Sequence, residues 1–451
     1  MPLRLLRHPL GGGFSAAGAF AALHGDDTDV FWLDSGSAGT SYLGAGERWL
    51  PAEPVLDAVR AELAGPVPEA DPEAPPFRLG LVGWLGYELR SETMGVPRTR
   101  TSRYPDAAFL RVVRALAIEP DGSAQLLALG ESWDEHADWR DSMLWRLSSA
   151  AGAYRNPRRG LDTPAAPALD QQVRWRDTDA EYIAKVLACQ EAIREGEAYQ
   201  LCLTTEAEVA GAFDPVEVYA RLRAQSPSHH GALLRIGEVS LLSSSPERFL
   251  EVHPDGVVRT HPIKGTRPRD ADAASDARLK EELLGSDKER AENIMIVDLM
   301  RNDLARVSEP GSVTVPSLLA VESYAQVHQL VSSIEGRLRD GLDGVDAIAA
   351  CLPAGSMTGA PKRRATELLD GLEQRARGLY AGAFGYLGRD GRIDLAMTIR
   401  SIVLDGRGAT IGTGGGITAL SVPEEEVAEA RLKAAALLRA LGDESPRADT
   451  L

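Results

Sequence analysis

Two segments of the sequence carry pairs of glutamates three residues apart. Glu289 and Glu292 lie in SDKERAENIMIVDLMRND, and Glu426 and Glu429 lie in SVPEEEVAEARLKAAALL. Residues three apart share one face of a helix, so each pair points in one direction. If the two helices face one another, the four carboxylates form an oxygen-rich site suited to Mg²⁺, which also keeps waters and a ligand oxygen. Because the chain has 66 acidic residues, each pair taken alone indicates a solvated helix face.

Lys264 lies in HPIKGTRPR, where a strand is expected to pass into a loop. Arg267 and Arg269 follow closely, and cationic neighbours are expected to lower the pKa of a lysine. A neutral lysine amine is a nucleophile. Without other information, however, Lys264 would be interpreted as a solvated loop residue.

A glycine run, GTGGG, places Gly412 and Gly414 to Gly416 just before a predicted helix that begins near Ser421. Backbone N–H groups exposed in such a run could hold an anion. A tight bulged turn is the alternative. The run is not a phosphate-binding P-loop, because no GK[ST] follows it.

Two more residues stand out by their surroundings. His328 lies within the apolar stretch SYAQVHQLVSSIEG, where a lone histidine is more often structural than catalytic. Arg400 lies among apolar and small residues in LAMTIRS. An arginine in that context needs an anionic partner, either a ligand or a protein carboxylate.

Capping signals and alternation predict the elements that position these residues. Helices are expected after the capping boxes Thr178/Glu181, Ser286/Glu289 and Ser421/Glu424, and after Pro361. Strands are expected in FRLGLVGWLGYELR, in YQLCLTTEAEV and in the segments around the hairpin signal Asp255-Gly256. Strands and clustered helices without a strict βα alternation favour an α+β fold.

The chain has 451 residues, enough for two or three domains. The segment 155–172 lacks periodicity and is predicted to be a linker, which gives a first part over residues 1–160 and a second over 173–442; the last residues are predicted to be a polar tail.

The net charge of −17 disfavours binding to nucleic acid or to an anionic membrane. No run of apolar residues is long enough to span a membrane, and the N-terminus is a poor signal peptide. Cys189, Cys202 and Cys351 show no disulfide or zinc pattern, so a cytoplasmic location is expected.

Eight motifs tie these residues together in chain order between about residues 175 and 440: SSSPERFL, PIKGT, ENIMIVDLMRNDL, VHQLVS, GSMTGAPKRRA, GLYAGAFGYL, MTIRS and GTGGGITALSVPEEEVAEARLKA. Together they resemble the chorismate-utilising enzymes, a family that includes anthranilate, aminodeoxychorismate, isochorismate and salicylate synthases. The first part resembles the N-terminal region of that family through FWLDSG, SYLG and LGLVGWLGYELR. The resemblance implies an α+β fold with two large antiparallel β-sheets packed face to face and helices outside.

Within the family, PIKGT is similar to the branch of aminodeoxychorismate synthase component I, because anthranilate synthases typically carry alanine at the position of Lys264. That branch aminates chorismate at C4 in 4-aminobenzoate and folate synthesis. It takes ammonia from a glutamine amidotransferase subunit, so a partner of that kind is implied. The three cysteines all lie inside synthase segments and match no amidotransferase nucleophile.

The resemblance also implies residue roles. Lys264 would add at C2 of the ring, Glu247 would act as general acid for the departing hydroxyl, and His328 would aid proton handling or orient the ring. Mg²⁺ would be held by Glu292 and Glu429 with help from Glu289 and Glu426. The implied substrate contacts come from Gly265, Thr266, Thr358, Tyr380, Arg400, Gly414, Gly415, Gly416 and Lys433.

Two alternatives remain open. A sister activity, such as that of anthranilate, isochorismate or aminodeoxyisochorismate synthase, would use the same fold. A non-catalytic chorismate-binding or scaffold protein would keep the fold and lose site residues, but none is lost here. Some relatives bind tryptophan in the N-terminal region. Leu33, Asp34 and Ser35 match one part of that pocket, whereas the segment 228–231, Ser-His-His-Gly, would reshape the other part.

Overall fold

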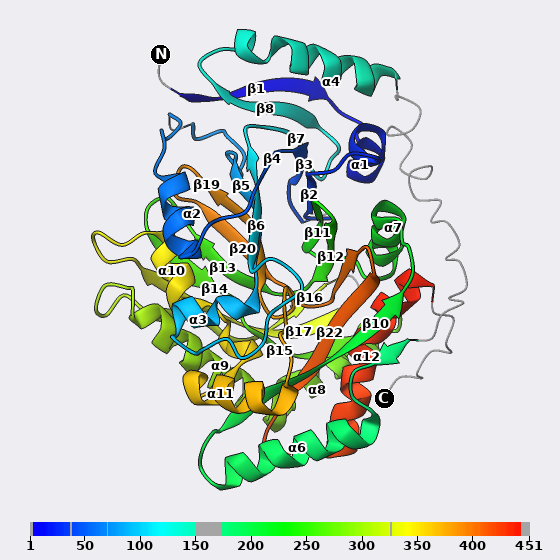
Figure 1. Cartoon of the computed structure of the whole chain (residues 1–451), viewed down its shortest axis with the longest axis vertical. Helices are drawn as coiled ribbons and strands as arrows, with labels where there is room; N and C mark the ends of the chain where they lie inside the picture. The colour runs from blue at the N-terminus through cyan, green and yellow to red at the C-terminus, as the bar shows by residue number, and fades with distance from the viewer. Residues whose placement is uncertain (1–2, 37, 70, 150–172, 325–326, 443–451) are drawn as a thin grey trace.

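The computed structural model describes residues 3–36, 38–69, 71–149, 173–324 and 327–442 (Figure 1). The predicted linker lies outside these residues. The predicted polar tail also lies outside them, except for its first residue, Gly442. The described strands form two large sheets in which every neighbouring pair is antiparallel. The fold is therefore α+β with two antiparallel sheets, as predicted.

The first sheet has the order β1-β8-β7-β3-β2-β11-β12-β21-β22-β10-β18, with β9 paired to β10. Its strands are β1 (Arg4–Gly11), β2 (Val30–Asp34), β3 (Ser41–Ala45), β7 (Arg114–Ile118), β8 (Ala124–Gly130), β9 (Arg174–Trp175), β10 (Gln200–Ala210), β11 (His230–Ile236), β12 (Val239–Ser245), β18 (Gly359–Ala360), β21 (Ser401–Asp405) and β22 (Gly408–Ile417).

The second sheet has the order β15-β17-β14-β13-β20-β19-β5-β6-β4, with β16 paired to β17. Its strands are β4 (Glu47–Trp49), β5 (Gly80–Leu85), β6 (Ala107–Val112), β13 (Arg248–Val252), β14 (Val257–Thr260), β15 (Ile263–Pro268), β16 (Thr314–Ser323), β17 (Val327–Arg337), β19 (Ala383–Gly388) and β20 (Ile393–Met397).

Strands from both parts of the sequence share both sheets. In the first sheet β2 pairs with β11, and in the second sheet β5 pairs with β19. The close pairing of β5 with β6 requires glycine at Gly83, because a side chain there would place Cβ 2.0 Å from the carbonyl oxygen of Ala108. The two parts of the sequence therefore do not form separate sheets.

The two sheets pack face to face around an aromatic core. One buried cluster contains Phe31 and Tyr42 of the first sheet together with Trp84 and Tyr386 of the second. Phe77 lies between them, with its ring centroid 5.3 Å from that of Tyr42 and 4.7 Å from that of Tyr386. Burying aromatic side chains of this size dominates the stability of such a core.

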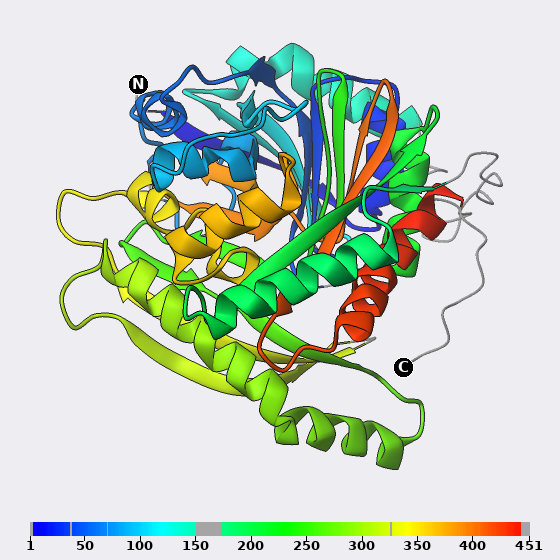
Figure 2. The ribbon, with the colours of Figure 1, turned by 60° about the horizontal axis from the view of Figure 1, so that its bottom comes forward.

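The helices lie outside the sheets. They are α1 (Ala16–His24), α2 (Val55–Leu63), α3 (Arg90–Thr93), α4 (Ala137–Ser149), α6 (Asp179–Arg194), α7 (Pro215–Gln225), α8 (Ala273–Gly285), α9 (Asp287–Ala305), α10 (Gly344–Cys351), α11 (Lys362–Glu373) and α12 (Pro423–Leu441), and the short 3-10 helices are η1 (Tyr87–Leu89), η2 (Trp133–His136) and η3 (Gly355–Met357). In Figure 2, α8 and α9 follow the lower edge of the molecule, and α12 and α6 lie above them.

Two of the three predicted capping signals are confirmed and one is wrong. Thr178 and Glu181 form a complete capping box on α6, and Ser286 caps α9. The N-cap of α12 is Val422, not Ser421. The Ser421 hydroxyl instead accepts a hydrogen bond from the backbone N–H of Thr418, in the turn before the helix.

No helix among the described residues is long and apolar enough to cross a membrane. Cys189, Cys202 and Cys351 are all buried and free, in agreement with the absence of a disulfide pattern in the sequence.

Candidate active site

A cavity of about 490 Å³ lies where β15, β22, α9 and α12 meet. It brings together residues that are up to 231 positions apart in the sequence, from Cys202 to Lys433. All but two of the predicted site residues line it, namely Glu247, Lys264, Gly265, Thr266, Glu289, Glu292, Tyr380, Arg400, Gly414, Gly415, Gly416, Glu426, Glu429 and Lys433.

The glycine run forms one wall of the cavity as part of a strand, so the alternative of a tight bulged turn is wrong. It belongs to β22, and Gly416 pairs with Cys202 of β10. Side chains on this strand would collide with the site. A Cβ at Gly412 would lie 2.1 Å from the ring of Tyr380, and one at Gly415 would lie 2.7 Å from Oε2 of Glu426. The glycines therefore provide the space that the functional side chains occupy.

Lys264 projects from β15 into the cavity, and a Cβ at Gly416 would lie 3.6 Å from its Nζ. Burial acts to lower the pKa of Lys264, but the charges of Glu292, Cys202, Glu247 and Glu429 outweigh it, so the pKa is raised. The prediction that cationic neighbours lower this pKa is wrong.

The two arginines behind that prediction are paired with carboxylates elsewhere. Arg267 contacts Glu282 and Glu289, each at 2.9 Å, and Arg269 contacts Asp276 at 2.8 Å. These carboxylates largely balance the charges of the two arginines, so the arginines do not lower the pKa of Lys264.

Glu247 is 8% exposed and lies close to Lys264. Burial raises the pKa of Glu247 to about 7, although the charge of Lys264 and a hydrogen bond from the Ser356 hydroxyl both act to lower it. That hydrogen bond spans 3.2 Å to Oε1. A carboxyl group with a pKa near neutral is suited to donate a proton at physiological pH.

Arg400 and Tyr380 lie on the same side of the cavity. The guanidinium of Arg400 makes no hydrogen bond or ion pair with any described residue, and burial lowers its pKa. Its backbone has φ of 50°, which is uncommon for a residue other than glycine. A strained, partly buried and unpaired arginine is the expected form of an anion-binding group.

The four glutamates approach from two helices. In the described part of the chain, no three acidic, histidine or cysteine side chains lie close enough together to hold a metal ion. Glu289 pairs with Arg267 at 2.9 Å, and Glu429 pairs with Lys433 at 2.5 Å. Oε2 of Glu426 is buried without a hydrogen-bond partner.

This donor set fits Mg²⁺ without a complete protein cage. Mg²⁺ is usually held by one or two carboxylates and keeps waters and ligand oxygens in its other positions. The orphaned oxygen of Glu426, in the space left by Gly415, is such a carboxylate. The pKa of Glu292 is raised, first by burial and also by the neighbouring Glu429 and Glu289, as expected where carboxylates gather.

Two predicted site residues do not line the cavity. His328 is 2% exposed, and its ring nitrogens contact the Ser323 hydroxyl and the Asp276 carboxylate at 2.8 and 3.0 Å. Thr358 is fully buried, and its hydroxyl donates to the carbonyls of Ala354 and Gly355. His328 therefore lies outside the cavity in which its predicted catalytic role would be carried out.

Several lining residues were missed. On β17, Gln329 faces the cavity, whereas its neighbour His328 does not. The alternation of a strand could have shown that only one of the two reaches the site, but not which one. The other missed lining residues are Cys202, Pro246, Ile263, Arg267, Lys288, Ser356, Met357, Ile399, Thr413 and Leu432.

A buried ion pair holds two walls of the cavity together. Arg377 donates to both carboxylate oxygens of Glu373, at 2.7 and 2.9 Å, and also to the backbone carbonyls of Met357 and Cys202. Its guanidinium lies 4.3 Å from the ring centroid of Tyr87, which belongs to the first part of the sequence. The first part of the chain thus contacts the scaffold of the site.

A second cavity, of about 430 Å³, lies between the sheets and contains Leu33, Asp34 and Ser35 as well as His229, His230 and Gly231. The Asp34 carboxylate is already engaged by Arg223, by the Ser41 hydroxyl and by the backbone N–H of Gly36. Pro246 and Ile263 line both this cavity and the first one.

Comparison with known proteins identifies relatives along most of the chain. Proteins named aminodeoxychorismate synthase from Streptomyces pristinaespiralis and Streptomyces griseus are 41% and 39% identical to it over 94% and 98% of this chain. The chain spans 63% and 65% of the length of those two relatives. Anthranilate synthase component 1 from Mycolicibacterium smegmatis is 38% identical, and the match covers 95% of this chain and 82% of that protein.

Solved structures show the same fold. Anthranilate synthase component I from Streptococcus pneumoniae matches with a TM-score of 0.73 at 26% identity, over 97% of this chain and 92% of that one. Residues 24–439 match the family described as chorismate binding enzyme. This match includes every residue of the first cavity, and the chain therefore belongs to the chorismate-binding enzyme family.

Proposed function

We propose that this chain catalyses the synthase reaction of aminodeoxychorismate synthase, in which chorismate and ammonia give 4-amino-4-deoxychorismate and water. The observation that carries the proposal is the position of Lys264, whose amine enters the same buried cavity as Glu247 and Arg400. The two relatives at 41% and 39% identity carry that name. A relative named anthranilate synthase component 1 is 38% identical, so amination at C2 is the second candidate.

Substrate binding follows from the charges that line the cavity. The unpaired guanidinium of Arg400 and the hydroxyl of Tyr380 would bind the enolpyruvyl carboxylate, and Lys433 and the backbone of β22 would add further contacts. Glu292 and Glu429, with Glu289 and Glu426, would hold Mg²⁺. When bound, this ion would supply positive charge for the ring carboxylate and offset the negative charge near Lys264.

The covalent steps use Lys264 and Glu247. The neutral amine of Lys264 forms a bond to C2 as the ring double bonds shift and the C4–oxygen bond breaks. Glu247 donates its proton to the departing hydroxyl, which leaves as water. Ammonia then forms a bond to C4, the double bonds shift back, and the C2–nitrogen bond to Lys264 breaks. The lysine leaves as the free amine, and the proton released by ammonia returns to Glu247.

Free ammonia must be kept from water at the moment of use, so a glutamine amidotransferase is the proposed source. The relatives of the same name are longer than this chain. Binding of such a partner would not change the residues that carry out the steps above. Ammonium salts should therefore replace the partner in the test tube.

The test is mass spectrometry of the products formed from chorismate, Mg²⁺ and an ammonium salt by the purified chain. The expected product is 4-amino-4-deoxychorismate. Formation of anthranilate or isochorismate would overturn the proposal and assign a sister activity. If chorismate stays unchanged with ammonium, a glutaminase subunit and glutamine are added. Continued inactivity would then show that the chain is not a synthase.

A further inference from the structure

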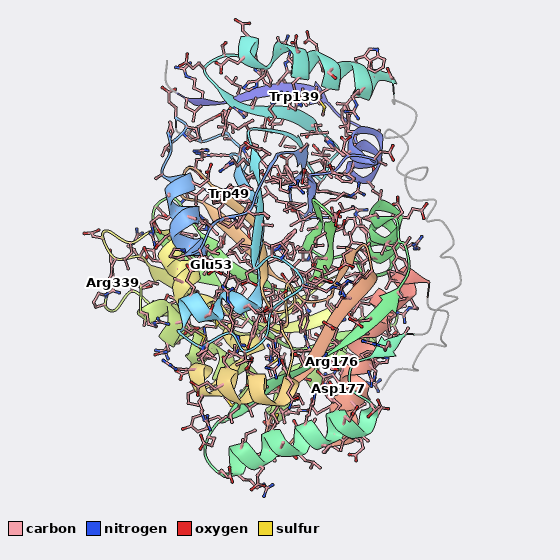
Figure 3. All side chains as sticks on the ribbon, viewed as in Figure 1. Trp49, Glu53, Trp139, Arg176, Asp177 and Arg339 are labelled. Carbon is pink, nitrogen blue, oxygen red and sulfur yellow. The ribbon has the colours of Figure 1, made fainter. Side chains whose placement is uncertain are left out.

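A third cavity, of about 440 Å³, lies far from the first in the fold. It is formed where the end of α1, the β3–β4 turn, the β6–β7 turn, α4 and the β19–β20 turn meet. Figure 3 labels Trp139 at this place, where α4 lies over the strands. The cavity shares no lining residue with the other two cavities described above.

Three guanidinium groups surround this third cavity. Arg111 pairs with Glu62 at 2.9 Å and with Glu47, which also lines the cavity, at 3.3 Å, and Arg389 lies 3.6 Å from the Glu62 carboxylate, so two acids serve these two arginines and none is left for the third. Arg114 has no acidic partner among the described residues and lies with its guanidinium 5.7 Å from the ring centroid of Trp139. The cavity is therefore positive in a chain whose net charge is −17.

The remaining walls are apolar. Leu43, Leu116 and Met143 line them together with Trp139. His24, which is 7% exposed, also lines the cavity; its Nδ1 contacts Asp27, and its Nε2 has no hydrogen-bond partner in the described part of the chain. Burial lowers the pKa of His24, so the ring is neutral at pH 7.

The floor of the cavity depends on glycine. A Cβ at Gly44 would lie 3.1 Å from the carbonyl oxygen of Arg114, and a Cβ at Gly46 would lie 2.8 Å from that of Arg111. Side chains at either position would push the β3–β4 segment away from the backbone that carries the arginines. The close approach of these two segments fixes the backbone position from which the Arg114 side chain extends.

We propose that the third cavity binds a small apolar carboxylate. The carboxylate would pair with Arg114, because a guanidinium that stacks on an aromatic ring leaves its N–H edge free for a planar, bidentate partner. The apolar body of the ligand would lie against Val113, which is 42% exposed, and against Trp139. A cavity of this size, mostly apolar with a few convergent polar groups, is typical of small-molecule sites. This inference is independent of the proposed reaction.

Isothermal titration calorimetry, in which benzoate is added to the full chain and the heat of binding is measured, tests the proposal. A ligand of this size is expected to bind with a Kd of roughly 0.1–1 mM. Benzyl alcohol, which has the same ring without the charge, should bind at least tenfold more weakly. Arg114→Gln should weaken benzoate binding at least tenfold. Arg174→Gln is the matched control, since Arg174 is 80% exposed and pairs only with Glu208 on the surface.

The first cavity must be excluded as the site, because Arg400 is also expected to bind carboxylates. Arg400→Gln should therefore leave benzoate binding at the third cavity unchanged, and saturating chorismate should not displace benzoate. The proposal is overturned if Arg114→Gln binds benzoate as tightly as the parent chain. It is equally overturned if Arg400→Gln or chorismate abolishes binding, or if benzoate does not bind at all.

Discussion

The Ser356 hydroxyl donates a hydrogen bond to Oε1 of Glu247 across 3.2 Å inside the first cavity. This bond favours the ionised form of a carboxyl group whose pKa burial raises to about 7. The pKa of Glu247 is thus a balance between burial, which raises it, and the charge of Lys264 together with the hydrogen bonds from Ser356 and the backbone of Ile263, which lower it. That balance can be moved by a single substitution.

The first prediction concerns pH. The reaction needs Glu247 protonated and Lys264 neutral, yet Glu247 titrates near pH 7 and the pKa of Lys264 is raised above its usual range. With the acid titrating below the base, the reactive pair is a minor state whose population rises with pH up to about 7, stays constant between the two pKa values, and falls above the pKa of Lys264. We expect kcat/KM to fall tenfold per unit below pH 7, measured at constant free ammonia.

Ser356→Ala removes the hydrogen bond that lowers the pKa of Glu247. The acidic limb of the profile should therefore move to higher pH. Glu247→Gln should lower kcat by roughly 10²–10⁴-fold and should remove this limb. A profile that is the same in all three proteins would contradict the role of Glu247 as the acid.

The second prediction concerns Lys264. Lys264→Ala should lower the rate of amination by at least about 10³-fold, because the covalent route is lost. In the parent chain, chorismate and Mg²⁺ without ammonia should give an adduct whose mass exceeds the protein by chorismate less one water. Intact-protein mass spectrometry measures this. Lys280→Ala, an exposed change on α8, should keep both the rate and the adduct.

The third prediction concerns the metal. A Cβ at Gly415 would lie 2.7 Å from Oε2 of Glu426, which is the mobile end of a side chain and can turn aside without unfolding the strand. Gly415→Ala should therefore fold normally but raise the Mg²⁺ concentration for half-maximal activity by about tenfold or more. Gly371→Ala on α11, where a Cβ meets nothing within 4 Å, is the control. An unchanged Mg²⁺ requirement would show that Glu426 does not hold the metal.

The fourth prediction separates function from stability at Arg400. Glycine adopts a φ of 50° freely, whereas glutamine does not. Arg400→Gly and Arg400→Gln should both raise the KM for chorismate strongly, because both lose the guanidinium. The free energy of unfolding in urea should be about 1 kcal/mol higher for Arg400→Gly than for Arg400→Gln. Equal stability of the two variants would show that the backbone at this position is not strained.

Much of the site could be predicted from the sequence because its motifs are local. The Glu-x-x-Glu spacing needs only the helical repeat, and α9 and α12 do carry these pairs to one cavity. The helix start at Thr178 was likewise confirmed, since a capping box is formed by residues three apart.

The errors arose where distant segments decide the outcome. The sequence left open whether GTGGG forms an anion-holding run before a helix or a bulged turn, but pairing with β10 draws it into β22. The pKa of Lys264 was predicted from Arg267, a neighbour in sequence. In the structure that arginine turns to Glu282 and Glu289, and carboxylates from other elements surround the lysine instead. Similarly, which of His328 and Gln329 faces the cavity depends on the register of β17 with its neighbours.

The sharing of both sheets between the two parts of the sequence limits how this enzyme can be divided. Without residues 1–160, β11 would lose its partner β2, and β19, which leads away from Tyr380, would lose its partner β5. Each would become an open edge of a largely apolar sheet, which is a template for aggregation. The half of the sequence that carries the site residues is therefore expected to be insoluble when it is produced alone. Truncation is thus the wrong way to look for a minimal catalyst.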